Sequence, residues 1–279
     1  MQIKKINFIF DKGSVKYKED ELIYNPPFFG ILDGSSGLYD PNIGPKLFKG
    51  LTGGQSVVKI VSDLLERAKE VDDLGVIIET ANKKVKDFIL ENSLPLNKSD
   101  ELPGCVFALV KITVNTVELI QAGDTMAFWQ MENGNIGYTR NQLKEYDRKF
   151  NKLVEDSMEK SKGDRNKAWN LLLPEHTKQR IKNINKKGGY AFLNGQKELK
   201  TYLYKTKIRA GVKLLLLFSD GFIQLAGRNE KELAKNVIKN YSLGGLKLIL
   251  EKKRLLEKDN ILRSHVEYAE ASGLALEFN

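Results

Sequence analysis

The sequence predicts an α+β fold in which an antiparallel β-sandwich is flanked by helices. Three patterns support this prediction: a group of short strands joined by tight turns over 106–138, two amphipathic helices directly before it, and a second group of strands over 190–218 that is followed by helices and a closing strand. Strands that come in groups, rather than alternating with helices, favour antiparallel sheets over a doubly wound parallel sheet. We expect a single domain over residues 1–279.

The N-terminal part is expected to contain strands, a long loop and two helices. Residues 28–32 are an apolar run that ends at Asp33, which predicts a buried strand. Glycine, proline and serine without periodicity predict a loop over 34–53. Apolar residues at helical spacing from Gly54 onward predict an amphipathic helix. The other elements predicted here are strands at 2–10 and 21–24 and a helix at about 75–92.

The strand signal is clearest in the middle of the chain. Asn133-Gly134 is a strong hairpin turn, and the segments around it predict an antiparallel meander. Residues 140–185 are highly charged and helical in tendency, with breaks at 161–166 and at Pro174, and they predict a helical insertion. The remaining predicted elements are strands at 106–114, 117–121, 125–131, 136–138, 190–193, 201–208, 213–218 and 273–278, and helices at 229–241 and 244–258.

Composition limits the classes of function. The chain has 279 residues, one cysteine and no run near the ~20 apolar residues that cross a bilayer. A single cysteine excludes an internal disulfide framework and fits a reducing compartment. The N-terminal stretch lacks the apolar core of a signal peptide. These features predict a soluble cytoplasmic protein without a membrane span, which we expect to be a monomer.

The net charge of +9 raises the question of nucleic-acid binding. Lysine clusters at 177–187 and 251–258 lie in helical patterns with acidic residues nearby, and no aromatic residues are interleaved to stack on bases. A solvated lysine-rich surface is the simpler interpretation, so nucleic acid is not the expected partner. The same charge favours anionic or phosphorylated partners.

Three aspartates, Asp33, Asp124 and Asp220, each lie beside a glycine at the end of a predicted strand. At such a place a side chain projects from a rigid sheet, and carboxylate and carbonyl oxygens suit Mg²⁺ or Mn²⁺. The chain has two histidines, which argues against a histidine-rich zinc site and against a Ser-His-Asp triad. Taken singly, each Asp-Gly pair is more often only a turn.

The order and context of these turns resemble the PPM family, the metal-dependent serine/threonine phosphatases of the PP2C type. The stretches that carry the resemblance are "FFGILDGSSG", "GGQSVVKIV", "GCVFALVKI", "VELIQAGDTMAFW", "KLLLLFSDGFIQL" and "EASGLALEF". They extend over about 10–40, 53–130 and 200–278 and leave 140–185 outside. The resemblance implies an α-β-β-α sandwich and hydrolysis of phosphoserine or phosphothreonine on a phosphorylated protein substrate.

The resemblance also implies a centre that holds two Mn²⁺ or Mg²⁺ ions and a weaker third. Asp33 would bridge two ions, Asp220 would hold the second and Asp124 would help the third, so Asp33 and Asp220 are the expected catalytic residues. Glu19 and Asp20 would position metal-bound water. The expected metal-binding residues are Asp20, Asp33, Gly34 (through its carbonyl), Asp124, Asp220 and Glu270. A water activated by the ions would attack phosphorus in line.

The chain departs from the family's pattern at two places that bear on activity. Lys16 and Lys18 stand where the family often has an arginine that binds substrate phosphate. Lysine still binds phosphate, but as a point charge without the bidentate fork. Ala269 stands where the family has a metal-binding aspartate. Either Glu270 beside it reaches the second ion after a shift of the loop, or water replaces the ligand, or the site is degraded.

Three functions therefore stay open: a metal-dependent protein phosphatase, a non-catalytic relative that binds a phosphorylated or signalling partner, and a basic nucleic-acid-binding protein. Other conspicuous residues are expected to be structural. Cys105 begins a buried-looking strand without the signature of a cysteine phosphatase, and Trp129 and Trp169 are expected to pack. The stretch at 50–54 precedes a helix but lacks the Lys-Ser/Thr of a phosphate-binding loop. His265 is expected on the surface or in a loop.

Overall fold

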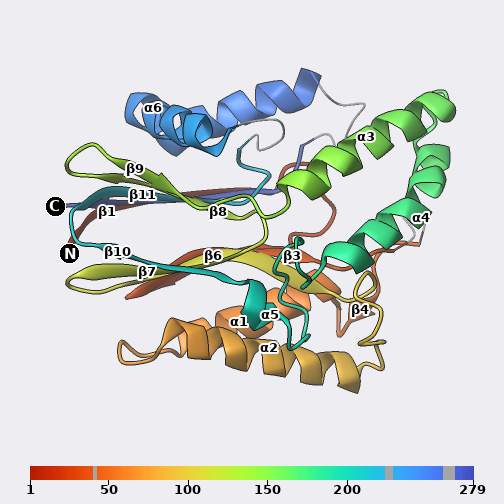
Figure 1. The fold of residues 1–279 in the computed structure, drawn as a ribbon, viewed down its shortest axis with the longest axis horizontal. Helices are drawn as coiled ribbons and strands as arrows, with labels where there is room; N and C mark the ends of the chain where they lie inside the picture. Colours follow the sequence, from red (N-terminus) through yellow and green to blue (C-terminus); the bar gives the residue numbers. More distant parts are fainter. Residues whose placement is uncertain (40–42, 224–228, 260–267) are drawn as a thin grey trace.

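A computed structural model describes residues 1–39, 43–223, 229–259 and 268–279. Its layers follow the order helix, sheet, sheet, helix (Figure 1). The strands are β1 (Ile3–Asp11), β2 (Asp20–Asn25), β3 (Phe28–Ser35), β4 (Leu47–Phe48), β5 (Leu51–Thr52), β6 (Gly104–Ile112), β7 (Thr116–Ala122), β8 (Met126–Met131), β9 (Ile136–Tyr138), β10 (Tyr204–Arg209), β11 (Val212–Phe218) and β12 (Ala271–Phe278). The helices are α1 (Gly53–Glu66), α2 (Leu74–Glu91), α3 (Lys144–Lys160), α4 (Arg165–Asn183), α5 (Leu199–Tyr202) and α6 (Glu230–Asp259).

Two five-stranded sheets form the centre of the molecule. The first has the order β1-β12-β11-β8-β9 and the second the order β10-β7-β6-β3-β2, while β4 and β5 form a separate short hairpin. The strand pairs are antiparallel. Helices α1 and α2 cover the outer face of the second sheet, and α6 covers that of the first (Figure 1). This arrangement confirms the predicted antiparallel sandwich flanked by helices.

The apolar run of β11 is continuous because both of its faces are covered. Leu215 and Leu217 pack in the layer between the sheets, whereas Leu214, Leu216 and Phe218 pack in the layer under α6. Side chains of a strand alternate between its faces, so a strand buried on both sides is apolar at every position. The end of β11 is therefore held firmly.

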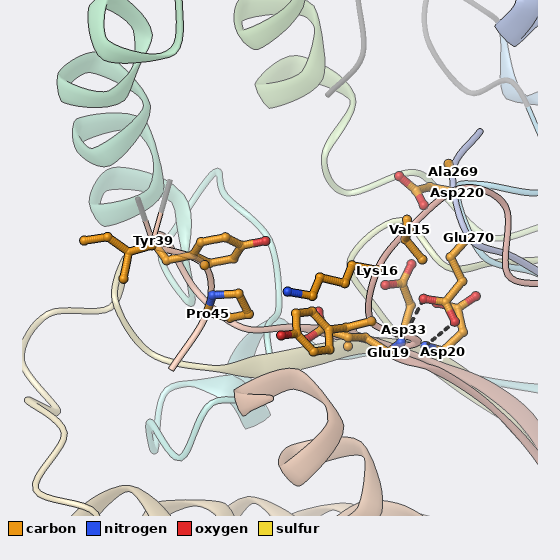
Figure 2. A pocket seen from close by; sticks show the side chains of 14 residues that line it. Val15, Lys16, Glu19, Asp20, Asp33, Tyr39, Pro45, Asp220, Ala269 and Glu270 are labelled. Carbon is orange, nitrogen blue, oxygen red and sulfur yellow. Dashed lines mark hydrogen bonds between the residues drawn. The ribbon is translucent and has the colours of Figure 1, made fainter. Parts of the chain in front are cut away.

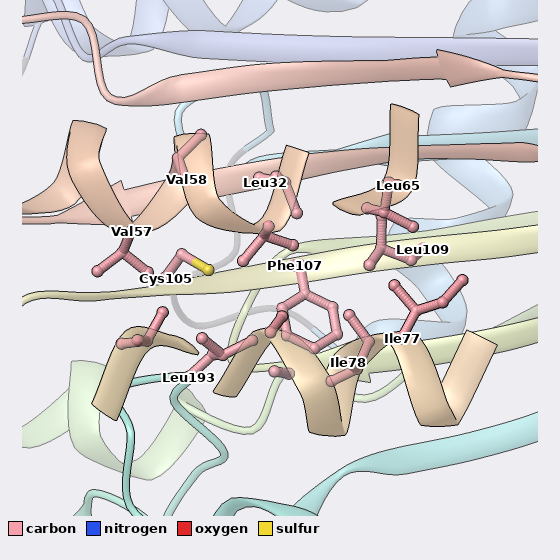
Figure 3. Packing of buried hydrophobic residues seen from close by; sticks show 14 of the residues in the cluster. Leu32, Val57, Val58, Leu65, Ile77, Ile78, Cys105, Phe107, Leu109 and Leu193 are labelled. Atoms are coloured by element: carbon pink, nitrogen blue, oxygen red, sulfur yellow. The ribbon is translucent and has the colours of Figure 1, made fainter. Parts of the chain in front are cut away.

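Strand β3 is buried in the same way in the second sheet. Phe29 and Ile31 belong to the layer between the sheets, and Phe28 and Leu32 belong to the core under α1 and α2. Figure 3 shows this core, in which Leu32 lies among side chains of both helices and of β6. The burial of these two strands thus fixes the positions of Asp33, near the end of β3, and of the turn with Asp220, just after β11.

The predicted meander is divided between the two sheets. Strands β6 and β7 lie in the second sheet and β8 and β9 in the first, so the turn at 123–125 carries the chain across the sandwich. The prediction was wrong here because turn signals show where a strand ends, not which neighbour the next strand joins. The predicted strand at 190–193 is also wrong: its residues make only isolated bridges.

Two further differences and one confirmed prediction concern the ends and interruptions of single elements. The predicted strand at 201–208 is preceded by α5, which takes up its first residues, because Leu199 is buried in the core under α1 and α2. Pro174 lies inside α4 on an exposed position instead of breaking the helix. The two predicted C-terminal helices are confirmed as the halves of α6, with non-helical backbone at Gly244 and Gly245 between them.

The charged segment at 140–185 is confirmed as helical. Helices α3 and α4 form a lobe at the end of the sandwich opposite the chain termini (Figure 1). The break between them lies within the predicted 161–166, where the Asp164 side chain caps α4 by accepting a hydrogen bond from the Lys167 amide at 3.1 Å. Within the described residues, no helix combines the length and apolar character needed to cross a membrane.

Candidate metal centre

Two aspartates of the second sheet lie opposite each other. Asp20 is the first residue of β2, and it is paired in register with Asp33 near the end of β3. Directly opposed residues of antiparallel strands have their side chains on the same face, about 4.5–5.5 Å apart at Cβ. Asp20 is 4% exposed, although carboxylates are rarely buried without a partner. The strand register therefore places the buried carboxylate of Asp20 beside the partly buried carboxylate of Asp33.

The other acidic residues come from the turns that lead into or out of the first sheet. Asp220 follows β11, Asp124 lies in the turn between β7 and β8, and Glu270 immediately precedes β12. The turn before Asp124 requires glycine, since Gly123 has φ +74° and an added Cβ would lie 2.1 Å from a methyl group of Val106. Figure 2 shows the side chains of Asp20, Asp33, Asp220 and Glu270 gathered at one place.

The electrostatics reflect how close these carboxylates lie to one another. Burial raises the pKa of Asp33 well above its ordinary value, and the nearby carboxylates of Asp20, Asp220, Asp124 and Glu270 add to the increase. Burial, followed by the charge of Glu270, raises the pKa of Asp20 to about 8. Burial and the charge of Asp220 raise the pKa of Asp124 well above its usual range. Among the described residues, none of these five side chains takes part in a salt bridge.

The donor set fits a hard divalent cation. The ligand atoms on offer are carboxylate oxygens, and the buried Oδ2 of Asp20 has no hydrogen-bond partner in the described structure. A cation would supply both the missing partner and the missing positive charge. As the side chains stand, no three His, Cys, Asp or Glu residues in the described parts of the chain are close enough to hold one ion. Binding therefore requires the carboxylates to close around the cation.

Gly34 lies where its backbone can approach the centre. It lines the same cleft as Asp20 and Asp33, and its amide donates a hydrogen bond to the carbonyl of Glu19 at 3.1 Å. A Cβ at this position would lie 2.7 Å from that carbonyl oxygen, so glycine permits the close contact between β2 and β3.

Glu270 is directed at the backbone of the acidic pair. One carboxylate oxygen, Oε2, accepts a hydrogen bond from the Glu19 amide at 2.8 Å, and the other, Oε1, accepts one from the Asp20 amide at 3.0 Å (Figure 2). Ala269 lines the same cleft as Asp220, and Figure 2 shows these two residues next to each other. Ala269, which stands where the resemblance led us to expect an aspartate, therefore lies beside the acidic residues of the cleft.

Glu19 is turned toward the start of α1. Its Oε1 accepts hydrogen bonds from the hydroxyl groups of Ser36 and Thr52. Thr52 is the N-cap of α1 and forms a capping box with Gln55. Burial raises the pKa of Glu19, and these hydrogen bonds oppose the increase. The stretch at 50–54 is thus a capped start of a helix, and its threonine also orients Glu19, a role that sequence reasoning missed.

The two lysines expected to bind phosphate point to different places. Lys16 lines a cleft of about 540 Å³ that is also lined by Asp20, Asp33, Asp220 and Glu270. Lys18 instead lies over the ring of Phe10, with Nζ 4.1 Å from the ring centroid, and lines a second hollow beside α1 that shares Glu19 and Asp20 with the first. The cleft is also lined by apolar and aromatic residues, of which Tyr39 and Pro45 lie on the side of Lys16 away from the carboxylates (Figure 2) and the others are Val15, Tyr17 and Ile43.

Sequence reasoning missed one acidic residue near the centre. Asp147 is on α3, in the lobe that lies outside the family resemblance. Burial and the charge of Asp220 raise the pKa of Asp147 to about 7, while a hydrogen bond from the Asn141 side chain at 3.3 Å opposes the increase. The neighbouring Gln142 ties the lobe to the turn before Asp124, because its side-chain oxygen accepts the Gly123 amide at 3.0 Å. The sequence could not single out Asp147, because the segment at 140–185 contains many charged residues and no motif marks this one.

The residues expected to be structural are not part of the centre. Cys105 is fully buried in β6, and burial raises the pKa of its thiol, which does not suit a nucleophile. Trp129 packs against the layer between the sheets, and Trp169 contacts the ring of His176 inside the lobe, which confirms the predicted packing roles. His265 lies outside the described residues.

Solved structures that resemble this fold include bacterial serine/threonine phosphatases. Stp1 from Staphylococcus aureus matches 100% of this chain and 96% of its own, with a TM-score of 0.58 and 17% sequence identity. PstP/Ppp from Mycobacterium tuberculosis matches 99% of this chain and 98% of its own, with a TM-score of 0.57 and 13% identity. A structure of the PstP catalytic domain in complex with two manganese ions matches 98% of this chain and 97% of its own, with a TM-score of 0.55 and 13% identity.

The likeness lies in the structure and not in an overall similarity of sequence. No protein-family model matches the sequence, and no curated protein is similar to it at a significant level. The structural neighbours nevertheless cover nearly the whole chain, including the sandwich that assembles the acidic centre. The resemblance read from the motifs is thereby confirmed for the architecture, and the chain has the fold of the PPM (PP2C-type) serine/threonine phosphatases.

Proposed function

We propose that this protein hydrolyses phosphoserine or phosphothreonine on phosphorylated proteins, with two Mn²⁺ or Mg²⁺ ions and a weaker third. The observation that carries the proposal is a group of neighbouring carboxylates from both sheets that form no salt bridge in the described structure. Asp20 and Asp124 are buried, Asp33 and Glu270 are partly buried, and the exposed Asp220 lines the same cleft as Asp20, Asp33 and Glu270. Asp33, Asp220 and Asp20, with the carbonyl of Gly34, would hold the two ions, and Asp124 would help to hold the third. Residues 1–279 would act as one domain, with the lobe as an insertion.

Bound divalent ions would lower the pKa of water and neutralise charge on the phosphoryl oxygens. The chain's own residues supply the rest. Lys16 is placed to orient the phosphate from the wall of the cleft, and the rigid ends of β3 and β11 keep Asp33 and Asp220 in position. Cytoplasmic location and a monomeric state stay predictions.

A direct assay tests this function. We expect the purified chain to hydrolyse p-nitrophenyl phosphate and a phosphothreonine peptide when Mn²⁺ is added, and to lose this activity in EDTA. A second candidate function, binding of a phosphorylated partner without turnover, is favoured by one observation: Ala269 puts a methyl group next to Asp220 (Figure 2). Retention of the phosphopeptide with no turnover under any divalent ion would establish this second function instead.

The two lysines provide a matched pair for the substrate site. Lys16→Ala is expected to raise the KM for a phosphopeptide roughly tenfold, because a hydrogen bond to a charged group contributes about 1.5–3 kcal/mol. Lys18→Ala removes the same charge from a side chain that lies over Phe10 and should leave the KM close to that of the unmodified protein. Steady-state kinetics on both variants check this, and equal effects would contradict the assignment of Lys16 alone.

Ala269 offers a test by gain of function. Ala269→Asp is expected to strengthen Mn²⁺ binding by about tenfold or more, since it adds a carboxylate beside Asp220. Ala269→Asn is the control, because it adds a neutral oxygen of similar reach and should give a smaller gain. Isothermal titration calorimetry measures both. If Ala269→Asp binds Mn²⁺ no better than the unmodified protein, residue 269 does not face the ions.

A further inference from the structure

Glu270 was expected to be a metal ligand, but its contacts indicate a different role. Both of its carboxylate oxygens accept backbone hydrogen bonds, one from Glu19 and one from Asp20, at 2.8 and 3.0 Å. These two amides belong to consecutive residues at the start of β2, and Glu270 stands just before β12. The side chain therefore joins the first sheet to the second at the metal centre.

The peptide that Glu270 holds is also fixed from its other side. The carbonyl of Glu19 accepts the hydrogen bond from the Gly34 amide at 3.1 Å, next to Asp33 in β3. One continuous series of bonds thus runs from Glu270 through the Glu19–Asp20 backbone to Gly34. These bonds fix the position of the Asp20 backbone and so the direction from which its side chain enters the centre. The Oδ2 atom of that side chain is buried and has no hydrogen-bond partner in the described structure.

Moving Glu270 onto a cation would disrupt this arrangement. Hydrogen bonds from amides to a carboxylate are stronger than bonds between neutral groups. If the carboxylate rotated away, two partly buried amides at the edge of the second sheet would lose their acceptors, which is unfavourable for backbone groups.

We infer that Glu270 is a positioning residue that holds the Glu19–Asp20 backbone in the orientation that presents Asp20 and Gly34 to the metal ions, and that it is not itself a metal ligand. This inference rests on the proposed function for the identity of the site. The bonds that Glu270 makes are independent of that function and can be measured in metal-free protein.

The test uses the full chain labelled with ¹⁵N, without metal. We expect the amide protons of Glu19 and Asp20 to resonate downfield and to move upfield in Glu270→Gln. Glu257→Gln is the matched control, because Glu257 is also a carboxylate near this segment, with Oε1 3.4 Å from the Ala269 amide, but does not bond to either amide. Glu270→Asp keeps the charge but is one methylene shorter, and it should also move both amides upfield.

Metal binding then separates positioning from ligation. Adding Mg²⁺ should leave the downfield shifts of Glu19 and Asp20 in place, and electron paramagnetic resonance should count as many Mn²⁺ ions in Glu270→Gln as in the unmodified protein, with a several-fold lower affinity. Asp33→Asn should reduce the number of ions. The inference is overturned if Mg²⁺ moves both amides to their Glu270→Gln positions, or if Glu270→Gln loses an ion as Asp33→Asn does. If the unmodified protein binds no ion, the proposed function fails, and the metal-free spectra alone decide the role of Glu270.

Discussion

Asp33→Asn is expected to reduce Mn²⁺-dependent phosphatase activity by on the order of 10²- to 10³-fold or more, the size of effect that follows removal of one preorganised electrostatic element. Asp33 is the carboxylate whose pKa is raised by the largest number of acidic neighbours, namely Asp20, Asp220, Asp124 and Glu270. Asp33 therefore has more carboxylate neighbours than the other acidic residues of the centre, and a cation bound beside it would have the most favourable electrostatic interaction. Asparagine has nearly the same shape but lacks the charge, so binding of the cation should suffer while the fold is kept.

The assay compares kcat and KM of Asp33→Asn with those of Asp63→Asn, a surface control. Asp63 is on α1 and pairs with Lys59 at 2.9 Å in an exposed salt bridge, and such pairs contribute little. Without metal, Asp33→Asn should also unfold at a higher temperature than the unmodified protein at pH 8, because it replaces a partly buried carboxyl group among other carboxylates with a neutral amide. Near-normal activity of Asp33→Asn would contradict the proposed centre, as would an equal loss in Asp63→Asn.

The second large effect is expected in the dependence of stability on pH. The pKa of Asp20 is raised to about 8 and that of Asp147 to about 7 in the folded protein, against an ordinary value of 3.8. At pH values between the ordinary pKa of 3.8 and these raised pKa values, the folded state binds more protons than the unfolded state. The free energy of unfolding therefore falls as pH rises from about 4 toward 8. Each such group contributes about 1.4 kcal/mol per pH unit. We expect the metal-free protein to melt about 5–10 °C lower at pH 8 than at pH 5.5.

Mn²⁺ should reverse this loss at high pH. Deprotonated carboxylates bind the ion and protonated ones do not, so the ion should raise the melting temperature strongly at pH 8 and weakly at pH 5.5. At a concentration 100 times its dissociation constant, a ligand adds about 2.7 kcal/mol to the free energy of unfolding. Calorimetric scans with EDTA and with Mn²⁺ at both pH values check the prediction. A metal-free protein that is more stable at pH 8, or an Mn²⁺ shift that is larger at pH 5.5, would contradict it.

Much of the architecture could be predicted from local patterns, and the errors have a common cause. The apolar runs before Asp33 and Asp220 identified strands that are buried on both faces, because such strands need apolar residues at every position. The division of the meander at residues 123–125 could not be predicted, since a tight turn has the same composition whether the next strand pairs with the previous one or crosses to another sheet.

For the candidate site too, local sequence predicted some features and long-range contacts decided the others. Residue type and the neighbouring glycines singled out Asp33, Asp124 and Asp220 as possible cation ligands. Their meeting depends on strand register and on the stacking of the two sheets, which also bring Asp20 opposite Asp33. The orientation of Glu270 toward two backbone amides left no trace in the sequence, because a glutamate before a strand looks the same whichever way it points.

The sequence by itself determined the class of fold, the apolar strands and the acidic character of the candidate site, because each of these depends on residues that are neighbours along the chain. Only the tertiary structure decided which carboxylates share a cleft, which of the two lysines faces it, and that Asp147 of the lobe belongs near the centre. Those outcomes depend on contacts between segments far apart in sequence, and the packing of the two sheets, not local propensity, sets the distances between them.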